Sequence, residues 1–413
     1  EVSSNLQLSG WQKFWKLDVP FAIPGLVWNM MMSMSGGWFF VVASEAITVG
    51  DKTITLPGVG SYLAVAIEQR DLHAVGYVIL AMIAVILLYD QFLFRPLVAW
   101  ADKFRMEDTA SQAGAPESWV LNLIQRTRVI QRLLRPFARA MTRIGHMRLS
   151  LPRSKTVATP PDPAISRAID WVWGGVIAVL TLYILYRIAG YVSSEVTLAE
   201  VGHVLGLGLI TLLRVTLLIA VASVIWVPLG VMIGLRPRLA EKIQPLAQFL
   251  AAFPANLLFP VFVIVILRYQ LNPDIWLSPL IVLGTQWYIL FNVIAGASAF
   301  PNDFKEAAAN FRIRGWLWWR KVMLPGIFPY YVTGAITASG GAWNASIVSE
   351  FVSWGQDKVV AHGLGAYIAQ TTAAGDFPKI TLGVVVMSLF VVAFNRLVWR
   401  PMYAIAENKL RLN

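Results

Sequence analysis

Long apolar runs constrain this chain more than any other feature of its sequence. Each is about as long as the roughly 18–20 residues that an α-helix needs to cross a bilayer. Strands of membrane barrels are only about ten residues long and alternate between apolar and polar positions, so these runs predict helices. The sequence therefore predicts an all-α polytopic membrane protein, and 57% hydrophobic against 14% charged residues agrees with this. We expect spans over residues 21–44, 74–94, 168–190, 205–235, 244–267, 276–299, 326–349 and 378–399.

The formal net charge of +11 alone would suit a nucleic-acid partner. In a polytopic membrane protein, however, an excess of Lys and Arg ordinarily marks the cytoplasmic connections. Residues 95–167 carry 13 Lys or Arg against 5 Asp or Glu, and the other Arg-rich connections fall on the same side. We therefore expect no nucleic-acid partner. We expect a multi-pass membrane protein, with this linker and the C-terminus in the cytoplasm.

Two parts of the chain repeat each other at a constant offset of 305 residues. About twenty identities fall in roughly a hundred aligned positions without a gap, including Ser44-Glu45 with Ser349-Glu350. Such self-similarity indicates two copies of one structural module. The even number of spans between them predicts that the modules are parallel, related by an axis along the membrane normal.

The repeat divides the chain into three parts. Residues 1–105 form the C-terminal part of a first module, which we expect to be incomplete here because it opens on its own connecting loop. Within it, residues 45–73 are expected outside the membrane, on the face opposite the linker. Residues 106–167 form the cytoplasmic linker, in which a basic amphipathic helix over 118–149 is expected to lie on the anionic leaflet. Residues 168–413 form a complete six-span second module, with a basic loop at 302–325.

That loop contains the sequence EAAANFRIRGWLWWRKVMLP at residues 306–325. It resembles the EAA loop of the membrane subunits of ABC importers through Glu306-Ala307-Ala308, Gly315 and Leu324-Pro325. Arg312 stands where that family often has its glycine. We expect Gly315 to end or bend the helix. Residues 1–20 repeat the loop in degraded form, with Glu1 and Gly10 at the equivalent positions.

Within the importer class, the chain is similar to the nitrate, taurine and aliphatic-sulfonate permeases. The residues that carry this resemblance are Thr211-x-x-Arg214, Pro228-Leu229-Gly230 and the Pro254/Pro260 stretch. The resemblance implies the ABC importer transmembrane-domain fold, here as two parallel tandem modules in one chain. It implies a permease subunit that forms the solute pathway, with a small anion of the nitrate or sulfonate type as solute.

The resemblance also implies the partners. Two ATP-binding-cassette subunits would bind ATP and Mg²⁺, and a periplasmic solute-binding protein would deliver the solute. The coupling loops would contact the ATPase subunits, so the implied coupling residues are Glu306, Ala307, Ala308, Gly315, Glu1 and Gly10. Ala307 and Ala308 are expected to be small so that the loop sits close to its partner. The chain has no Gly-x-x-x-x-Gly-Lys-Ser/Thr loop, so we expect no ATPase activity and no cofactor in it.

Polar residues within or at the ends of the spans are candidates for the translocation pathway. A carboxylate at membrane depth marks function by default, although at an interface it also serves as a solvated cap. Small polar residues equally serve helix packing, and Arg214 suits either an anionic solute or a structural ion pair. The candidates are Ser339, Asn344, Ser346, Glu350, Ser33, Ser35, Glu45 and Arg214.

Two other functions stay open. An ion-coupled secondary transporter of parallel-repeat design is the main alternative, and it would need carboxylates deep in the spans. A structural membrane scaffold is disfavoured because the loop recurs at the same offset. The four histidines lack the spacing of metal ligands, so no metal site is expected.

Overall fold

The computed structural model describes residues 8–50, 52–104, 118–147, 163–193 and 195–410. The chain divides into two compact units. Unit 1 comprises residues 1–30 and 88–195, and unit 2 comprises residues 31–87 and 196–413. The prediction of an all-α membrane protein is confirmed, with two short β-hairpins as the strands among the described residues.

The first repeat begins with a short helix that runs through a π-helical segment into a long apolar helix. A hairpin, a short helix and a second long helix follow. Its elements are α2 (Gly10–Lys13), η1 (Phe14–Asp18), α3 (Val19–Ser44), β1 (Ala46–Val49), β2 (Lys52–Thr55), α4 (Val59–Glu68), α5 (Leu72–Tyr89), η2 (Asp90–Phe94), α6 (Arg95–Ala101) and η3 (Asp102–Phe104).

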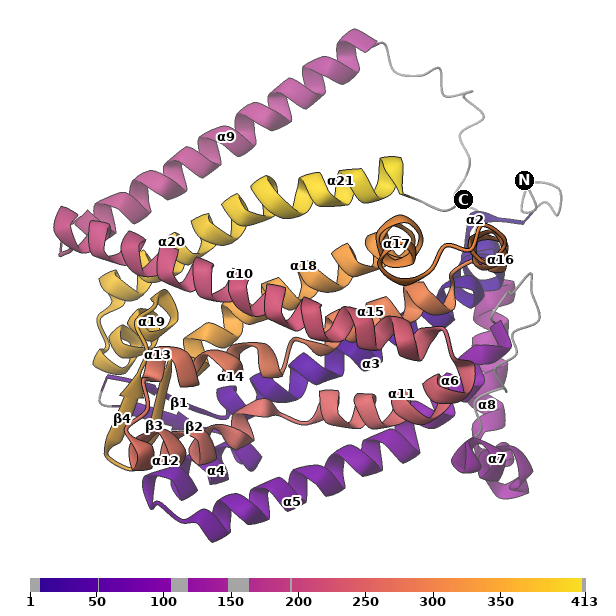
Figure 1. Cartoon of the computed structure of the whole chain (residues 1–413), viewed down its shortest axis with the longest axis horizontal. Helices are drawn as coiled ribbons and strands as arrows, with labels where there is room; N and C mark the ends of the chain where they lie inside the picture. The colour runs from indigo at the N-terminus through magenta and orange to yellow at the C-terminus, as the bar shows by residue number, and fades with distance from the viewer. Residues whose placement is uncertain (1–7, 51, 105–117, 148–162, 194, 411–413) are drawn as a thin grey trace. The chain divides into compact units, whose positions relative to one another are not determined.

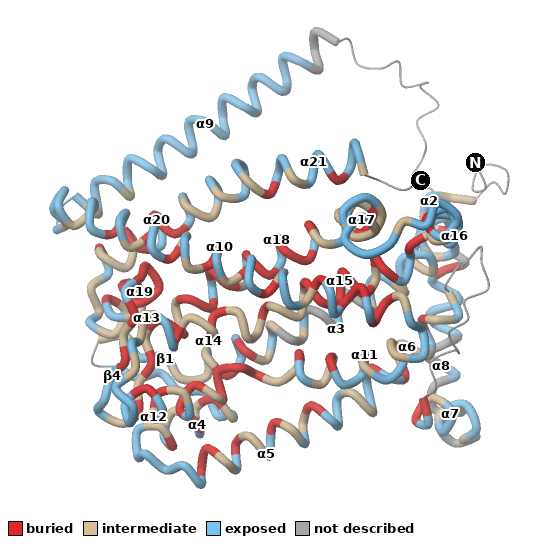
Figure 2. Tube along the Cα trace, in the orientation of Figure 1, coloured by how far each residue is buried: buried red, intermediate tan, exposed pale blue. Residues whose placement is uncertain are grey.

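The linker forms two helices, α7 (Trp119–Arg126) and α8 (Arg128–His146). The single helix expected over 118–149 is therefore wrong, because the backbone of Thr127 is extended (φ −86°, ψ 109°) and separates the two helices. The next helix is α9 (Pro163–Ser193). From residue 167 on it is apolar and almost entirely pale blue in Figure 2, with none of its most apolar window buried.

The C-terminal part of the chain, from residue 198 on, is helical except for one hairpin. It contains the helices that precede the second repeat and then the second repeat itself. Its elements are α10 (Leu198–Gly234), α11 (Pro237–Ala252), η4 (Ala255–Leu258), α12 (Phe259–Tyr269), α13 (Pro273–Trp276), α14 (Ser278–Leu283), α15 (Trp287–Ser298), α16 (Asn302–Asn310), α17 (Gly315–Trp318), η5 (Trp319–Met323), α18 (Leu324–Ser349), β3 (Phe351–Trp354), β4 (Asp357–Val360), α19 (Leu364–Ala374), α20 (Phe377–Phe394), η6 (Asn395–Trp399) and α21 (Arg400–Lys409).

The offset of 305 residues recurs in these bounds. α3 and α18 begin and end at equivalent residues, as do both strands of the two hairpins and the helices α5 and α20. In each hairpin the strands are antiparallel in the same register, with Ala46 opposite Thr55 and Phe351 opposite Val360. Sequence similarity and element bounds thus share one periodicity. This agreement supports two modules, and the module boundaries stay a proposal.

Four helices are long and apolar enough to cross a membrane, or up to seven if each bent pair counts as one span. This refers to the described residues alone. Two of the spans expected within unit 2 are broken. The span expected at 244–267 bends by 70° between α11 and η4, where Phe253 and Pro254 are extended. The span expected at 276–299 bends by 45° between α14 and α15.

The core of unit 2 is formed by α10, α15 and α18, which lie side by side in Figure 1. α15 is mostly buried in Figure 2, and Ile289, Val293 and Ile294 are 0% exposed. Glycines let the backbones approach closely. A Cβ on Gly230 of α10 would lie 2.8 Å from the Val293 side chain, and one on Gly334 of α18 would lie 2.6 Å from the Tyr288 carbonyl oxygen. Small residues at such crossings are typical of membrane helices.

Candidate functional site

The segment with the EAA-type sequence folds as two short helices joined by a tight turn. α16 contains Glu306, Ala307 and Ala308 and ends at Asn310. The N–H of Ile313 donates to the Ala308 carbonyl (2.9 Å), which closes the helix C-terminus. Arg312 adopts the left-handed conformation (φ 52°) that this type of cap requires.

The expectation that Gly315 ends this helix is therefore wrong. Arg312 takes the left-handed position, at the place where the family often has its glycine. Gly315 instead opens α17, with φ +60° and no atom within 4 Å of a Cβ built on it. The sequence contained a signal for this cap, because Arg312 occupies the position where glycine is common in the loop that it resembles.

The three residues of the EAA-type sequence face different surroundings. Glu306 and Ala307 are exposed, whereas Ala308 is 4% exposed and packs against its own chain. The small size of Ala308 thus serves packing within the chain. A pocket of about 300 Å³ lies beside α16. It is lined by Phe300, Phe304, Ala307, Ala308, Phe311, Ile313, Lys321, Val322, Pro325, Gly326, Lys409 and Leu410.

The equivalent segment of the first repeat belongs to unit 1. Gly10 is exposed at the start of α2, and Ser9 and Gln12 hydrogen-bond each other's backbone in a capping box. The indole N–H of Trp11 donates to the carbonyl of Ile144 (2.7 Å) at the end of the linker helix α8. Glu1 lies outside the described residues.

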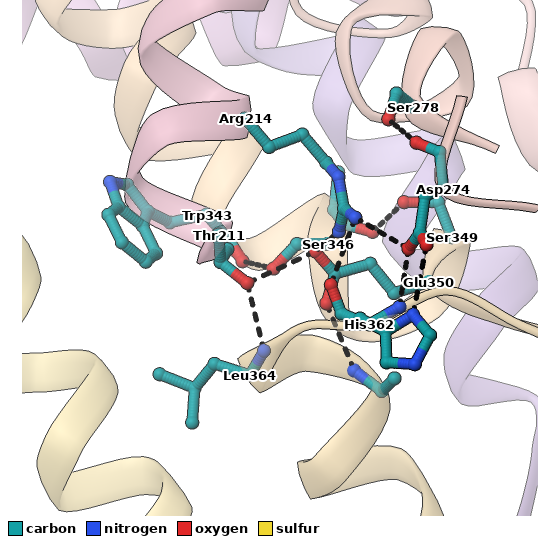
Figure 3. A network of polar contacts seen from close by, with 12 residues as sticks. Thr211, Arg214, Asp274, Ser278, Trp343, Ser346, Ser349, Glu350, His362 and Leu364 are labelled. Atoms are coloured by element: carbon teal, nitrogen blue, oxygen red, sulfur yellow. Dashed lines mark hydrogen bonds and ion pairs between the residues drawn. The ribbon is translucent and has the colours of Figure 1, made fainter. Parts of the chain in front are cut away.

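A buried ion pair connects two of the candidate pathway residues. Arg214 of α10 donates to the Glu350 carboxylate at 2.5 Å, and the side chains are 9% and 1% exposed. Arg214 also donates to Asp274 Oδ1 (3.1 Å) and to the His362 carbonyl (2.9 Å). Figure 3 shows Asp274 and the His362 ring on one side of this guanidinium.

The Glu350 carboxylate accepts two further hydrogen bonds. It accepts the Thr211 hydroxyl (3.2 Å) and the N–H of Ala366 (3.1 Å). Thr211 in turn accepts the N–H of Leu364 (2.8 Å). A Cβ on Gly363 would collide with the carboxylate, so a side chain at 363 is excluded by space although the backbone there is extended. The network thus joins the end of α18 to α10 and to the start of α19.

The first repeat contains the same carboxylate in a simpler setting. Glu45 accepts the N–H of Gly60, and a Cβ on Gly58 would collide with its carboxylate. Glu45 and Gly58 are equivalent to Glu350 and Gly363 at the offset of 305. The two sites therefore share the contact between a carboxylate and a glycine-led helix start.

The other pathway candidates lie in different surroundings. Ser339 and Ser346 are buried, and the Ser346 hydroxyl donates to the Trp343 carbonyl of its own helix (2.7 Å). Asn344 and Ser33 are exposed. The side chain of Ser35 lies outside the described residues. The structure brings Arg214 and Glu350 together, and it does not bring the polar residues of α3 and α18 into one cluster.

Sequence reasoning missed Asp274 and His362 as members of this network. His362 donates its backbone N–H to Asp274 Oδ1 (2.6 Å), and its ring Nδ1 lies 2.9 Å from Oδ2. A second pair joins α19 to α10, where the Tyr367 hydroxyl donates to Glu200 (2.9 Å). Burial and the neighbouring Glu200 carboxylate raise the pKa of Tyr367 above its ordinary value. Spacing gave no signal for either contact, since the partners lie 88 and 167 residues apart.

Part of unit 2 is similar in sequence to known proteins. Residues 226–410 match the family described as "Binding-protein-dependent transport system inner membrane component". The chain is 27% identical over 188 residues to the bicarbonate transport system permease protein CmpB of Synechococcus elongatus, covering 46% of this chain and 64% of the relative. It is 24% identical over 188 residues to the nitrate import permease protein NrtB of Leptolyngbya laminosa, with the same coverage. The chain thus spans 64% of the length of these curated relatives.

Proposed function

We propose that the chain is a permease subunit of an ABC importer, on the premise that residues 226–410 match the family described as "Binding-protein-dependent transport system inner membrane component". One observation carries the proposal. The matched region, residues 226–410, includes the whole EAA-type segment at residues 302–325 and the helices around it. The chain would form the solute pathway across the inner membrane and would leave ATP hydrolysis to separate subunits.

The proposed solute is a small anion. The two relatives described above are named for bicarbonate and for nitrate, and both are compact oxyanions with a single negative charge. The net charge of +11 adds no support, because much of it lies in the linker.

We propose that α16 and the turn after it dock on an ATP-binding subunit in the cytoplasm. Glu306, Arg312, Arg314 and Trp316 are all exposed there and are available to a partner. The segment of the first repeat would offer a second docking site, so that two ATPase subunits bind one chain. A solute-binding protein would approach from the opposite, periplasmic face, where the two hairpins lie in this topology.

Within this function, the ion pair between Arg214 and Glu350 holds α10 and the end of α18 together. These two residues do not bind the solute. Their charges neutralise each other, and Glu350 already has three partners. Exposed polar side chains such as Asn344 and Ser33 are better placed to meet a solute in the pathway. Glu350 is the one buried carboxylate among the described residues, and its ion pair gives ion-coupled transport no support.

Copurification tests the proposal. The full chain is purified in nanodiscs or mild detergent from the cells in which it is naturally made. We expect an ATP-binding subunit to copurify with the native chain and to be lost or weakened with Glu306→Arg. Glu195→Arg is the matched control, because Glu195 is an exposed acid outside the proposed docking segments. An ion-driven flux of nitrate or bicarbonate into proteoliposomes without any ATPase would contradict the importer function.

A further inference from the structure

The two repeats hold each other through a reciprocal contact within unit 2. The tip of the second hairpin reaches the end of α4, where the N–H of Gly355 donates to the Ile67 carbonyl (2.9 Å). The tip of the first hairpin reaches the end of α19, where the N–H of Gly50 donates to the Thr372 carbonyl (3.3 Å). Gly50 and Gly355 are equivalent at the offset of 305, and so are Ile67 and Thr372. We call the two contacts together the hairpin clasp.

This reciprocity is the signature of a two-fold interface, in which one surface patch meets a copy of itself. In the hairpin clasp the two patches come from the two repeats of one chain. The backbone hydrogen bonds of the clasp do not distinguish the first repeat from the second. They would form equally well between two first repeats or between two second repeats of different chains.

The side chains of the clasp are different on its two sides. At the second hairpin, the Arg70 guanidinium pairs with Asp357 at 2.7 Å. The Arg70 side chain also lies over Gly355, which has φ +61° and no room for a Cβ. The equivalent of Arg70 is Gly375, and a Cβ built there would lie 3.2 Å from the Gly50 Cα. The equivalent of Asp357 is the exposed Lys52.

We propose that Arg70 and Asp357 select the pairing of the first repeat with the second and disfavour the pairing of like repeats from two chains. Two first repeats would place Lys52 against Arg70, which are both cationic. Two second repeats would place Asp357 against Gly375, which offers no charge. The pairing of unlike repeats alone forms an ion pair and avoids the repulsion.

The ion pair acts on selectivity more than on strength. Its side chains are 47% and 50% exposed, and exposed pairs contribute little to stability. Like charges brought together at an interface nevertheless suppress wrong partners effectively. This inference concerns the assembly of the repeats, and it holds whether or not the proposed transport function is correct.

Disulfide cross-linking of the full chain tests the proposal, since the native sequence has no cysteine. Gly50→Cys with Gly375→Cys places the reporter on the side of the clasp away from the ion pair, where the two backbones already touch. Intrachain cross-links give a monomer band on a non-reducing gel. The strain of cysteine at two left-handed positions is common to all variants and cancels in the comparison.

Three charge variants are compared in this background. Asp357→Lys opposes Arg70 with a cation and is expected to slow cross-linking about fivefold. Arg70→Glu is expected to slow it similarly and also to raise the fraction of dimer in light scattering, because Lys52 would then attract residue 70 of a second chain. The double variant Arg70→Glu with Asp357→Lys is expected to restore the native rate.

Lys52→Asp is the matched control, because Lys52 is the equivalent of Asp357, whereas the equivalent of Arg70 is the uncharged Gly375; the described residues show no ion pair of Lys52. It is expected to leave the rate unchanged. The proposal is overturned if the single charge variants cross-link at the native rate or if Lys52→Asp slows the reaction as much as they do. It is also overturned if the double variant stays as slow as the singles, since the loss would then be one of folding.

Discussion

Arg214 and Glu350 lie 136 residues apart in the sequence and form an ion pair at 2.5 Å with almost no exposure to solvent. Removing one partner of a buried pair is costly, because the other charge stays desolvated. Through this pair the end of α18 is fixed to α10 and, by way of the Ala366 N–H, to α19.

Replacing Glu350 by alanine is expected to lower the free energy of unfolding by about 3–5 kcal/mol, because Arg214 would stay buried with weaker partners. Thermal unfolding in detergent, followed by tryptophan fluorescence, measures the loss as a lower Tm. Glu45→Ala is the control, since Glu45 is half-buried and is held by a backbone N–H. Equal losses of Tm in the two variants would show that the ion pair has no special weight.

Gly363→Ala is expected to lower Tm by several degrees. A Cβ at this position collides with the Glu350 carboxylate and displaces it from Arg214 or Ala366. The same change at Gly340 of α18, where nothing lies within 4 Å, is expected to be neutral or to stabilise the helix by up to about 1 kcal/mol. The same thermal assay compares the two, and a Gly363→Ala protein as stable as the native chain would contradict the crowding at this site.

Arg312→Gly is expected to stabilise the end of α16 by about 0.5–1 kcal/mol, because glycine adopts the left-handed conformation at residue 312 without steric cost. Hydrogen exchange of residues 302–311 measures the effect as slower exchange. Arg314→Gly is the control, since the Arg314 backbone is extended (φ −134°) and gains nothing from glycine. Slower exchange in both variants would point to the lost charge instead of the cap.

Acidification is expected to weaken the start of α20. The Asp376 carboxylate caps this helix at the Lys379 N–H (3.2 Å) and pairs with the Lys379 ammonium (2.8 Å). The hydrogen bond from Lys379 lowers the pKa of Asp376 below its ordinary value.

Because the folded pKa is the lower one, this contribution is complete above the unfolded pKa of about 4 and disappears as the pH falls through the folded value. It is expected to be below about 1 kcal/mol, since the pair is partly exposed. Tm measured from pH 7 to pH 3 is expected to fall less in Asp376→Asn than in the native chain. Parallel profiles for the two proteins would contradict the assignment.

Much of the fold was readable from the sequence because its causes are local or repetitive. Long apolar runs have to be helices in a bilayer, since backbone groups there find partners only within the helix. The offset of 305 residues in the sequence recurs in the bounds of α3 and α18 and of both hairpins. The EAA-type segment was located by its residues, and its cap at Arg312 stood at the family's glycine position.

The sequence by itself thus determined the helical class, the register of the repeat and the place of the EAA-type segment. Only the tertiary structure decided which polar groups meet. Arg214 with Asp274 and Glu350, and Arg70 with Asp357, are joined across 60, 136 and 287 residues. It also decided that Pro254 lies in a break of a span, whereas Pro228 lies inside the continuous helix α10. Such outcomes depend on which neighbours supply partners for the freed backbone and side-chain groups, and that is a property of packing.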